Sequence, residues 1–331
     1  MSLFHCPIQV NQLEIKNRLV MPPMATGKAD LDGKVTPGLI DYYRKKSQGG
    51  YIGLIITEHM YVNLEGKASK NQLSIAEDED LEGLKELVGV IHENGTKTFA
   101  QLNHAGGAAD SQLTGKEVYG PSRASLPGSL QIFQEMPKDH IQGLVEDFTR
   151  AALRAKAAGY DGVEIHSAHG YLLDQFYSPL TNHREDEYSG KTLEGRLHFQ
   201  VQIIQSIRKV LGPTYPIAVR LGACDYLEGG AALEDAIGAG KILQEAGLDL
   251  IDISGGLKGF VHPENKEPGY FKEASKAIKE TLSIPVILTG GITKITEAES
   301  LLEEGAADLI GVGRAILKDD LWAQKAMEKG Q

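Results

Sequence analysis

The stretch that decides the fold is Gly159-Tyr-Asp-Gly-Val-Glu-Ile165, which joins a glycine, a short polar turn and an apolar β-type run. Glycine readily takes the left-handed conformation that closes a helix, and aspartate favours the turn into a strand. Residues 141–158, just before it, keep one apolar face at helical spacing. The segment therefore predicts a helix, a tight turn and a buried strand in direct succession.

The same unit recurs along the chain and predicts eight strands. They are expected at 19–24, 50–57, 95–102, 159–165, 212–220, 247–253, 284–289 and 305–312, with amphipathic helices at 141–158, 192–211, 233–246 and 295–304. Most strands are apolar on both faces, and no Gly-x-Gly-x-x-Gly motif follows the first strand. The pattern therefore favours an α/β fold of the closed (β/α)8 TIM-barrel type over an open doubly wound sheet.

Smaller features complete the expected domain. Residues 8–10 and 13–15 alternate apolar and polar side chains around Asn11-Gln12, which predicts an N-terminal β-hairpin that plugs the bottom of the barrel. Two segments, 104–139 and 170–191, are longer than ordinary loops and follow strand ends, where barrel enzymes build their sites. We find no linker, so we expect one domain over residues 1–331.

Composition excludes several classes of partner. The chain has 331 residues and a formal net charge of −11, without a basic run, which argues against nucleic acid and anionic membranes. Cys6 and Cys224 are isolated from each other and provide no disulfide framework or metal-cluster spacing. No stretch is long and apolar enough for a membrane span, and the first residues lack a signal sequence, so we expect a cytoplasmic protein. The sequence leaves open whether it forms a homo-oligomer.

Three polar side chains, His166, His169 and Tyr171, follow the strand at 159–165. In parallel barrels the carboxyl ends of the strands carry the ligand site. A lone histidine there more often bonds to the backbone, but three such groups at one strand end favour a functional site. The ends of other strands would place residues around the same ligand site, among them Met24-Ala25-Thr26, Glu58-His59, Gln101 and His104.

The last two strands predict a phosphate site. Barrels commonly hold a phosphate with the loops after strands seven and eight, and here these loops read Thr289-Gly-Gly291 and Gly311-Val-Gly-Arg314. Gly290, Gly291 and Gly313 would let the backbone approach, and Arg314 would supply charge. The alternative is a pair of ordinary tight turns.

Arg220 ends the strand at 212–220 and needs an acceptor, because an unpaired buried guanidinium is costly. Its structural alternative is a salt bridge with Asp225 or Glu164. Its functional alternative is a heteroaromatic ring that accepts hydrogen bonds from Arg220 and Gln101 together.

With these residues in view, the chain resembles the Old Yellow Enzyme family of FMN-dependent NAD(P)H oxidoreductases over nearly its whole length. The motifs that carry the resemblance are Lys16-Asn-Arg-Leu-Val-Met-Pro-Pro-Met24, Gln101-Leu-Asn-His-Ala-Gly-Gly107, Ile165-His-Ser-Ala-His-Gly-Tyr-Leu-Leu173, Ser178-Pro-Leu-Thr-Asn-His-Arg-Glu-Asp-Glu-Tyr188, Ile217-Ala-Val-Arg220 and Gly311-Val-Gly-Arg314. The combination is far more specific than any single motif.

The resemblance implies FMN as cofactor, NADH or NADPH as electron donor, and a small activated alkene such as an enone or nitroalkene as substrate. It implies that His166 and His169 bind the substrate oxygen, that flavin N5 supplies the hydride, and that Tyr171 delivers the proton. The implied cofactor contacts are Gln101 and Arg220 at the pyrimidine edge, Pro23, Met24, Ala25 and Thr26 beside the ring, and Gly290, Gly291, Gly313 and Arg314 at the phosphate.

The chain also departs from the family pattern. It has Ala25 where many relatives place Cys or Thr against the flavin, and Thr26 is the alternative partner for the flavin O4 edge. Its two cysteines do not form the iron–sulfur cluster motif of the longer dienoyl-CoA reductase relatives, and we expect no second flavin domain like theirs. We expect the segment after Leu321 to be too short to complete a neighbouring subunit's site.

Two other functions stay open at this point. One is a flavin-binding barrel with low ene-reductase activity, which Ala25 leaves open. The other is a metal-dependent barrel hydrolase or lyase that uses His166 and His169 with Glu58 or His59 as ligands. The carboxylate-rich shell that usually supports such a site is missing from the sequence.

Overall fold

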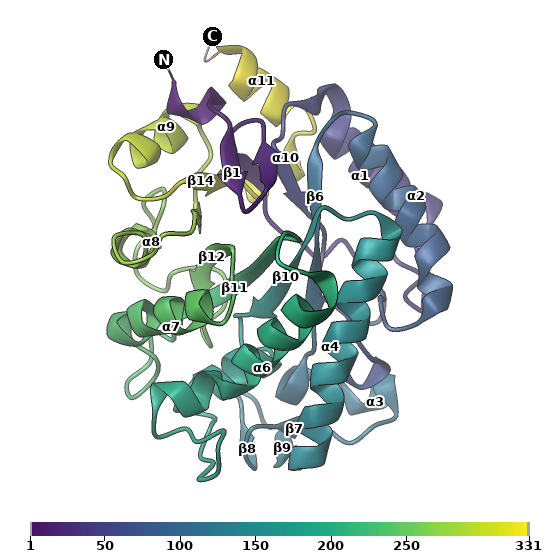
Figure 1. Cartoon of the computed structure of the whole chain (residues 1–331), viewed down its shortest axis with the longest axis vertical. Helices are drawn as coiled ribbons and strands as arrows, with labels where there is room; N and C mark the ends of the chain where they lie inside the picture. Colours follow the sequence, from purple (N-terminus) through teal and green to yellow (C-terminus); the bar gives the residue numbers. More distant parts are fainter. Residues whose placement is uncertain (1, 330–331) are drawn as a thin grey trace.

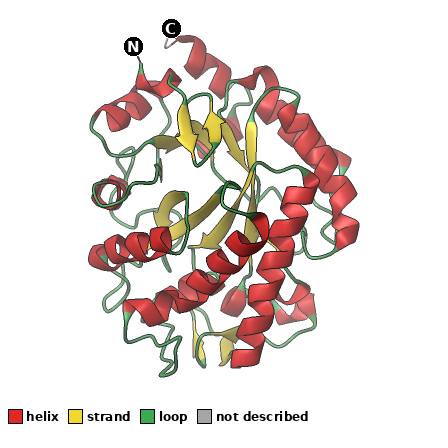
Figure 2. Ribbon diagram, in the orientation of Figure 1, coloured by secondary structure: helices red, strands yellow, loops and turns green. Residues whose placement is uncertain are grey.

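The computed structural model describes residues 2–329 and contains a closed barrel of eight parallel strands (Figure 2). The strands are β3 (Leu19–Met21), β4 (Leu54–Ile56), β6 (Lys97–Asn103), β10 (Gly162–Ser167), β11 (Ile217–Cys224), β12 (Leu250–Gly255), β13 (Val286–Thr289) and β14 (Leu309–Gly311). Strand β10 pairs with both β6 and β11, and β14 pairs with β3, so the sheet closes on itself. The predicted (β/α)8 barrel is confirmed, with a strand at each of the eight expected places.

Helices surround the strands on the outside (Figure 1). They are α1 (Pro37–Ser47), α2 (Leu81–His92), α4 (Lys138–Ala158), α6 (Leu193–Leu211), α7 (Leu233–Glu245), α8 (Lys272–Lys279), α9 (Ile295–Glu303) and α10 (Arg314–Lys318). The four helices expected from apolar periodicity correspond to α4, α6, α7 and α9. Helix α4 ends at Gly159, whose φ of 98° is the left-handed cap that the sequence predicted.

The N-terminal hairpin closes the bottom of the barrel, as predicted. Strands β1 (Ile8–Val10) and β2 (Leu13–Ile15) pair antiparallel. The fully buried side chains of Val10 and Ile15 pack with apolar residues at the amino-terminal ends of the barrel strands, among them Leu54, Leu250 and Leu309. A larger apolar core lies between the strands and the outer helices. Burial from both sides explains why the barrel strands read as continuous apolar runs.

The two long connections contain structure of their own. Segment 104–139 contains α3 (Ser111–Thr114) and the short strands β7 (Tyr119–Gly120), β8 (Ala124–Ser125) and β9 (Ile132–Glu135), which form a small sheet at one end of the molecule (Figure 1). Segment 170–191 begins with α5 (Leu172–Tyr177). Strand β5 (Met60–Tyr61) extends the barrel sheet beside β6, and short 3-10 helices lie at Leu3–His5, Gln48–Gly50, Leu64–Gly66, Asp78–Asp80 and Gly106–Ala108.

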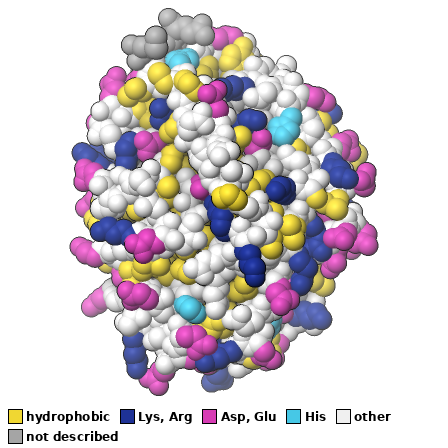
Figure 3. All heavy atoms as spheres, in the orientation of Figure 1, with side chains coloured by type: hydrophobic (Ala, Val, Ile, Leu, Met, Phe, Trp, Pro, Cys, Tyr) yellow, Lys and Arg dark blue, Asp and Glu magenta, His cyan; other side chains and the backbone are white. Residues whose placement is uncertain are grey.

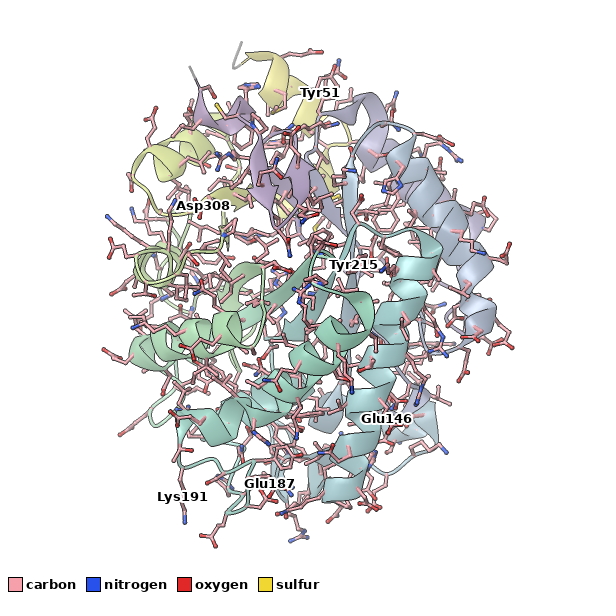
Figure 4. The ribbon with its side chains drawn as sticks, in the orientation of Figure 1. Tyr51, Glu146, Glu187, Lys191, Tyr215 and Asp308 are labelled. Carbon is pink, nitrogen blue, oxygen red and sulfur yellow. The ribbon has the colours of Figure 1, made fainter. Side chains whose placement is uncertain are left out.

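The last helix, α11 (Trp322–Lys329), packs on its own barrel. The Trp322 indole N–H donates to the Thr293 carbonyl over 2.9 Å, and Met327 is buried. The Tyr51 hydroxyl, labelled in Figure 4, donates to the Glu328 carboxylate over 2.8 Å. These contacts hold the described part of the tail against the subunit that it belongs to.

The visible face of the molecule has acidic and basic side chains interspersed, without a continuous patch of either sign (Figure 3). Within residues 2–329, no helix has the length and apolar character that crossing a membrane would require.

Candidate active site

A cavity of about 470 Å³ lies at the carboxyl ends of the barrel strands. Its lining residues are Pro22, Pro23, Met24, Ala25, His59, Gln101, His166, His169, Tyr171, Arg220, Phe260, Tyr270, Thr289, Gly290, Gly291, Ile292, Thr293, Gly311, Gly313, Arg314 and Leu317. Of the residues predicted for the site, Thr26, Glu58 and His104 do not line this cavity, and the others do. A second cavity of about 240 Å³ shares Tyr270 with the first and contains none of the predicted residues.

Gln101, on β6, has a fixed amide orientation. Its Nε2 donates to Oε1 of Glu164 over 2.8 Å, and the two residues lie opposite each other in the pairing of β6 with β10. Because Nε2 is engaged, Oε1 is the amide atom left for the cavity that Gln101 lines. This edge of the cavity can therefore accept a hydrogen bond from a ring N–H.

Arg220, buried in β11, pairs with Asp252 of β12. Its Nε lies 3.3 Å from Asp252 Oδ2, and the two residues are opposite in the strand register. The predicted structural partners, Asp225 and Glu164, were wrong, since Asp225 accepts from the Ser178 hydroxyl at 2.6 Å and Glu164 accepts from Gln101. The terminal nitrogens of Arg220 make no hydrogen bond to residues 2–329, so they can donate into the cavity.

Two buried carboxyl groups, of Asp252 and Glu164, lie near this guanidinium. Burial raises the pKa of Asp252 to about 6, and the nearby Arg220 opposes the rise. Burial and the neighbouring Asp252 raise the pKa of Glu164 well above its usual range, again against the influence of Arg220. The polar edge thus combines one cation with two carboxyl groups that hold protons unusually well.

A cluster of aromatic rings lies beyond this edge. The ring centroids of His166 and His169 are 5.0 Å apart, and those of His166 and Tyr171 are also 5.0 Å apart, both in edge-to-face geometry. His59 stacks on Tyr171, with centroids 5.4 Å apart and ring planes 30° apart. The structure therefore brings together the predicted pair of histidines and the predicted tyrosine, and adds a third histidine.

Burial sets the protonation of the cluster. It lowers the pKa of His59 to about 4, and it lowers the pKa of His166 and His169 well below the usual value for histidine. The three imidazoles are therefore neutral at neutral pH. Burial raises the pKa of Tyr171, so its phenol keeps the proton.

His169 has a left-handed backbone conformation, with φ of 61°. Its backbone N–H donates to the Gly255 carbonyl over 3.2 Å, and its Nε2 lies 2.7 Å from the Ser254 hydroxyl oxygen. A left-handed non-glycine residue costs about 1–3 kcal/mol and persists where its surroundings hold it. Here the two contacts to β12 fix the imidazole beside His166.

The other end of the cavity suits a phosphate. Gly290 and Gly291 have φ of 142° and 70°, and a Cβ on either would lie within 2.8 to 3.0 Å of the Tyr270 ring, so both positions require glycine. Arg314, the first residue of α10, donates from Nη2 to the Tyr270 hydroxyl over 3.4 Å. Glycine backbone beside an available guanidinium provides donors for an anion.

Thr26 does not line the cavity. Its hydroxyl donates to Oε2 of Glu58 over 2.6 Å and accepts from the Lys28 N–H over 3.1 Å. Burial raises the pKa of Glu58 to about 7, while the bond from Thr26 opposes the rise. Ala25 does line the cavity but offers only a methyl group.

The sequence analysis missed Phe260 and Tyr270, which lie in the 256–271 connection between β12 and α8. The Phe260 ring is 61% exposed and lies 5.9 Å from the His169 ring, and the Tyr270 hydroxyl donates to the Phe260 carbonyl over 2.8 Å. The longer segment 104–139 contributes no lining residue. Segment length alone therefore did not identify the connections that line the cavity.

The metal alternative finds no support in the side-chain arrangement. Within residues 2–329, no three His, Cys, Asp or Glu side chains are grouped as a metal site. Glu58 is hydrogen-bonded to Thr26 and does not line the cavity, and His59, although it lies beside His166, has its Nδ1 bonded to Gln72.

Known proteins are similar to this chain over nearly its whole length. Residues 2–331 match the family model of the NADH:flavin oxidoreductase / NADH oxidase family. An NADH oxidase of Thermoanaerobacter brockii is 39% identical over 98% of this chain, but the chain spans only 50% of that protein. An NADPH dehydrogenase of Bacillus subtilis (strain 168) is 38% identical over 98% of this chain and 94% of its own length.

A solved structure supports the same family assignment as these relatives. The Old Yellow Enzyme homologue of Zymomonas mobilis superimposes with a TM-score of 0.87 and 27% identity, over 100% of this chain and 94% of that one. The resemblance found in the motifs is therefore confirmed. The chain belongs to the NADH:flavin oxidoreductase / NADH oxidase family of FMN-dependent oxidoreductases, which includes the Old Yellow Enzymes.

Proposed function

We propose that this chain, as a single FMN-binding domain over residues 1–331, reduces activated C=C bonds with electrons from NADH or NADPH. The observation that carries the proposal is that one cavity combines the Gln101 and Arg220 edge, the glycine and Arg314 edge, and the histidine–tyrosine cluster. Similarity to an NADPH dehydrogenase over 94% of that protein's length supports a nicotinamide as electron donor.

The donors and acceptors of the cavity fit FMN. Oε1 of Gln101 can accept from a ring N–H, and Arg220 can donate to a ring oxygen and favour negative charge there. Gly290, Gly291 and Gly313 with Arg314 can hold the phosphate, and about 470 Å³ lies within the usual range of small-molecule sites. When bound, FMN would accept a hydride from the nicotinamide and transfer one to the alkene.

His166 and His169 would bind the carbonyl or nitro oxygen of the substrate. As neutral imidazoles, they can donate N–H groups without adding charge to the cavity. Negative charge develops on this oxygen as the alkene is reduced, so donors already held in place stabilise the transition state more than the ground state. The contacts of His169 to Ser254 and Gly255 supply that rigidity.

Tyr171 would donate the proton that completes the reduction. It lies beside His166, and burial raises its pKa, so the phenol is protonated at neutral pH. A positioned general acid of this kind typically contributes about 10²–10⁴-fold to a rate. Tyr171 precedes α5, and its backbone carbonyl accepts from the Gln175 N–H over 2.8 Å, which fixes the start of that helix.

Anaerobic flavin spectroscopy tests this proposal. Purified protein should carry non-covalent FMN, NADH or NADPH should bleach the flavin absorbance, and enones, nitroalkenes or enoyl thioesters should restore it. A protein that is bleached but that no alkene reoxidises would be a flavin-binding barrel with low ene-reductase activity, the alternative that Ala25 leaves open. A protein that does not bind FMN would contradict the proposal.

A further inference from the structure

His59 is a polar group of the cavity to which the mechanism above gives no role. It follows β4, is only 8% exposed and lines the cavity. Its ring stacks on Tyr171 and lies 6.2 Å from the ring of His166, in edge-to-face geometry. His59 is therefore next to the substrate-binding group, whereas Gln101 and Arg220 form the polar edge assigned to the cofactor.

A chain of hydrogen bonds fixes which nitrogen of His59 carries the proton. The Ala68 backbone N–H, which can only donate, lies 2.6 Å from Oε1 of Gln72. Nε2 of Gln72 must therefore be the amide atom that faces His59, and it lies 2.9 Å from Nδ1 and 3.3 Å from the His59 carbonyl. Nδ1 is thus an acceptor, and a neutral imidazole then carries its proton on Nε2.

The protonated nitrogen is the one that is available. Nε2 of His59 makes no hydrogen bond to residues 2–329, and the atom is not fully buried. It is therefore accessible from the cavity that the ring lines. Burial lowers the pKa of His59 to about 4, so above that pH Nε2–H remains a neutral donor.

We propose that His59 is a third substrate-binding donor, whose Nε2–H binds a second acceptor oxygen on the alkene. The inference rests on the proposed function, because His166 and His169 must already hold the first oxygen. It deepens that function by naming a substrate class. The enzyme would favour activated alkenes that carry two acceptor groups, such as enediones, over alkenes with one.

A matched pair of ligands tests the proposal. Ketoisophorone is isophorone with a second carbonyl group, so the two differ by one acceptor. Each is titrated into oxidised holoenzyme without nicotinamide, and the change in flavin absorbance gives a dissociation constant. The variants are His59→Phe, which keeps a ring beside Tyr171 but removes both nitrogens, and His59→Gln, whose amide can replace the Nε2 donor. The control is His198→Phe, because His198 also contacts a tyrosine ring and a glutamine amide but lies on α6, outside the cavity.

The expected results follow from the loss of one neutral hydrogen bond. His59→Phe should weaken ketoisophorone binding about five- to tenfold and isophorone binding by less than about twofold. His59→Gln should recover part of the difference, and His198→Phe should change neither constant. Equal weakening of both ligands by His59→Phe, or no weakening of either, would overturn the proposal. A shift of the flavin midpoint potential without a change in ligand preference would also overturn it, and would assign His59 to the cofactor.

A second measurement does not depend on ligand binding. Nitrogen-15 spectra of histidine-labelled holoenzyme, compared with those of the His59→Phe variant, identify the His59 signals and its tautomer. The proposal requires the Nε2–H tautomer, and an Nδ1–H tautomer would overturn it. The proposed function fails separately, if wild-type holoenzyme binds neither ketone and no alkene reoxidises its reduced flavin.

Discussion

Replacing Arg314 by alanine should weaken the binding of FMN and leave the binding of riboflavin unchanged. Arg314 follows Gly313 at the phosphate end of the cavity, and its one hydrogen bond to residues 2–329 is the 3.4 Å contact to the Tyr270 hydroxyl. Most of its donors are therefore available for an anion. Riboflavin has the same ring system but no phosphate, so it reports any general damage to the site.

The expected size of the effect follows from the exposure of Arg314. A hydrogen bond to a charged group contributes about 1.5–3 kcal/mol. Because Arg314 is an exposed residue, solvent screens its charge, and we take the lower limit. A loss of about 1.5 kcal/mol corresponds to roughly tenfold weaker FMN binding. The glycine backbone at positions 290, 291 and 313 stays in place and should retain the rest of the phosphate affinity.

Fluorescence titration of apoprotein with FMN and with riboflavin measures both dissociation constants. Arg314→Lys is the matched variant, since it keeps the charge but loses the planar guanidinium, and it should fall between wild type and Arg314→Ala. The difference between wild type and Arg314→Ala should shrink as salt concentration rises. Unchanged FMN affinity, or equal weakening of FMN and riboflavin, would refute the assignment of Arg314 to the phosphate.

Three further predictions concern stability and the chain terminus. Burial raises the pKa of Glu58 from 4.5 to about 7, so its native carboxyl group holds a proton that the unfolded chain releases, and stability is lost as pH rises through this interval. In denaturant titrations, the free energy of unfolding of Glu58→Gln should therefore rise relative to that of wild type by up to about 3 kcal/mol between pH 4.5 and 8. A difference that does not change with pH would contradict the raised pKa of Glu58. Ile15→Ala should lower the free energy of unfolding by about 2–5 kcal/mol because Ile15 is fully buried in the barrel plug, and a loss below about 1 kcal/mol would show that the hairpin is dispensable. Truncation after Ala326 removes the buried Met327 and the Tyr51–Glu328 hydrogen bond, so it should lower the melting temperature. Turnover should stay within about threefold of wild type. Loss of turnover with FMN still bound would show that the tail contributes to the site.

The sequence was sufficient for the barrel because each unit carries its own local signals. Gly159 adopts the left-handed cap at the end of α4, and the apolar run after it forms the fully buried β10. The hairpin could also be predicted, because its alternation of apolar and polar residues and its two-residue turn are local features. Most predicted site residues line the cavity because carboxyl ends of parallel strands meet at one face.

What the sequence did not reveal depends on which strands are neighbours and in what register. Arg220 meets Asp252 because β11 pairs with β12 in that register, and nothing close to Arg220 in the sequence indicates it. The direction of the Thr26 hydroxyl depends on Glu58, which is brought close by folding. Tyr270 reaches the cavity from a connection without a recognisable motif, and its ring packs on the two glycines after β13.

The measurement that tests the account most directly is the anaerobic stopped-flow comparison of wild type with Tyr171→Phe. Flavin reduction by NAD(P)H needs no proton from Tyr171, so its rate should stay within about twofold of wild type. Reoxidation by a cyclic enone needs that proton and should slow by about 10²–10⁴-fold, while His166→Ala and His169→Ala should mainly weaken enone binding. If Tyr171→Phe reoxidises with the enone as fast as wild type, another group donates the proton and the role assigned to Tyr171 is wrong.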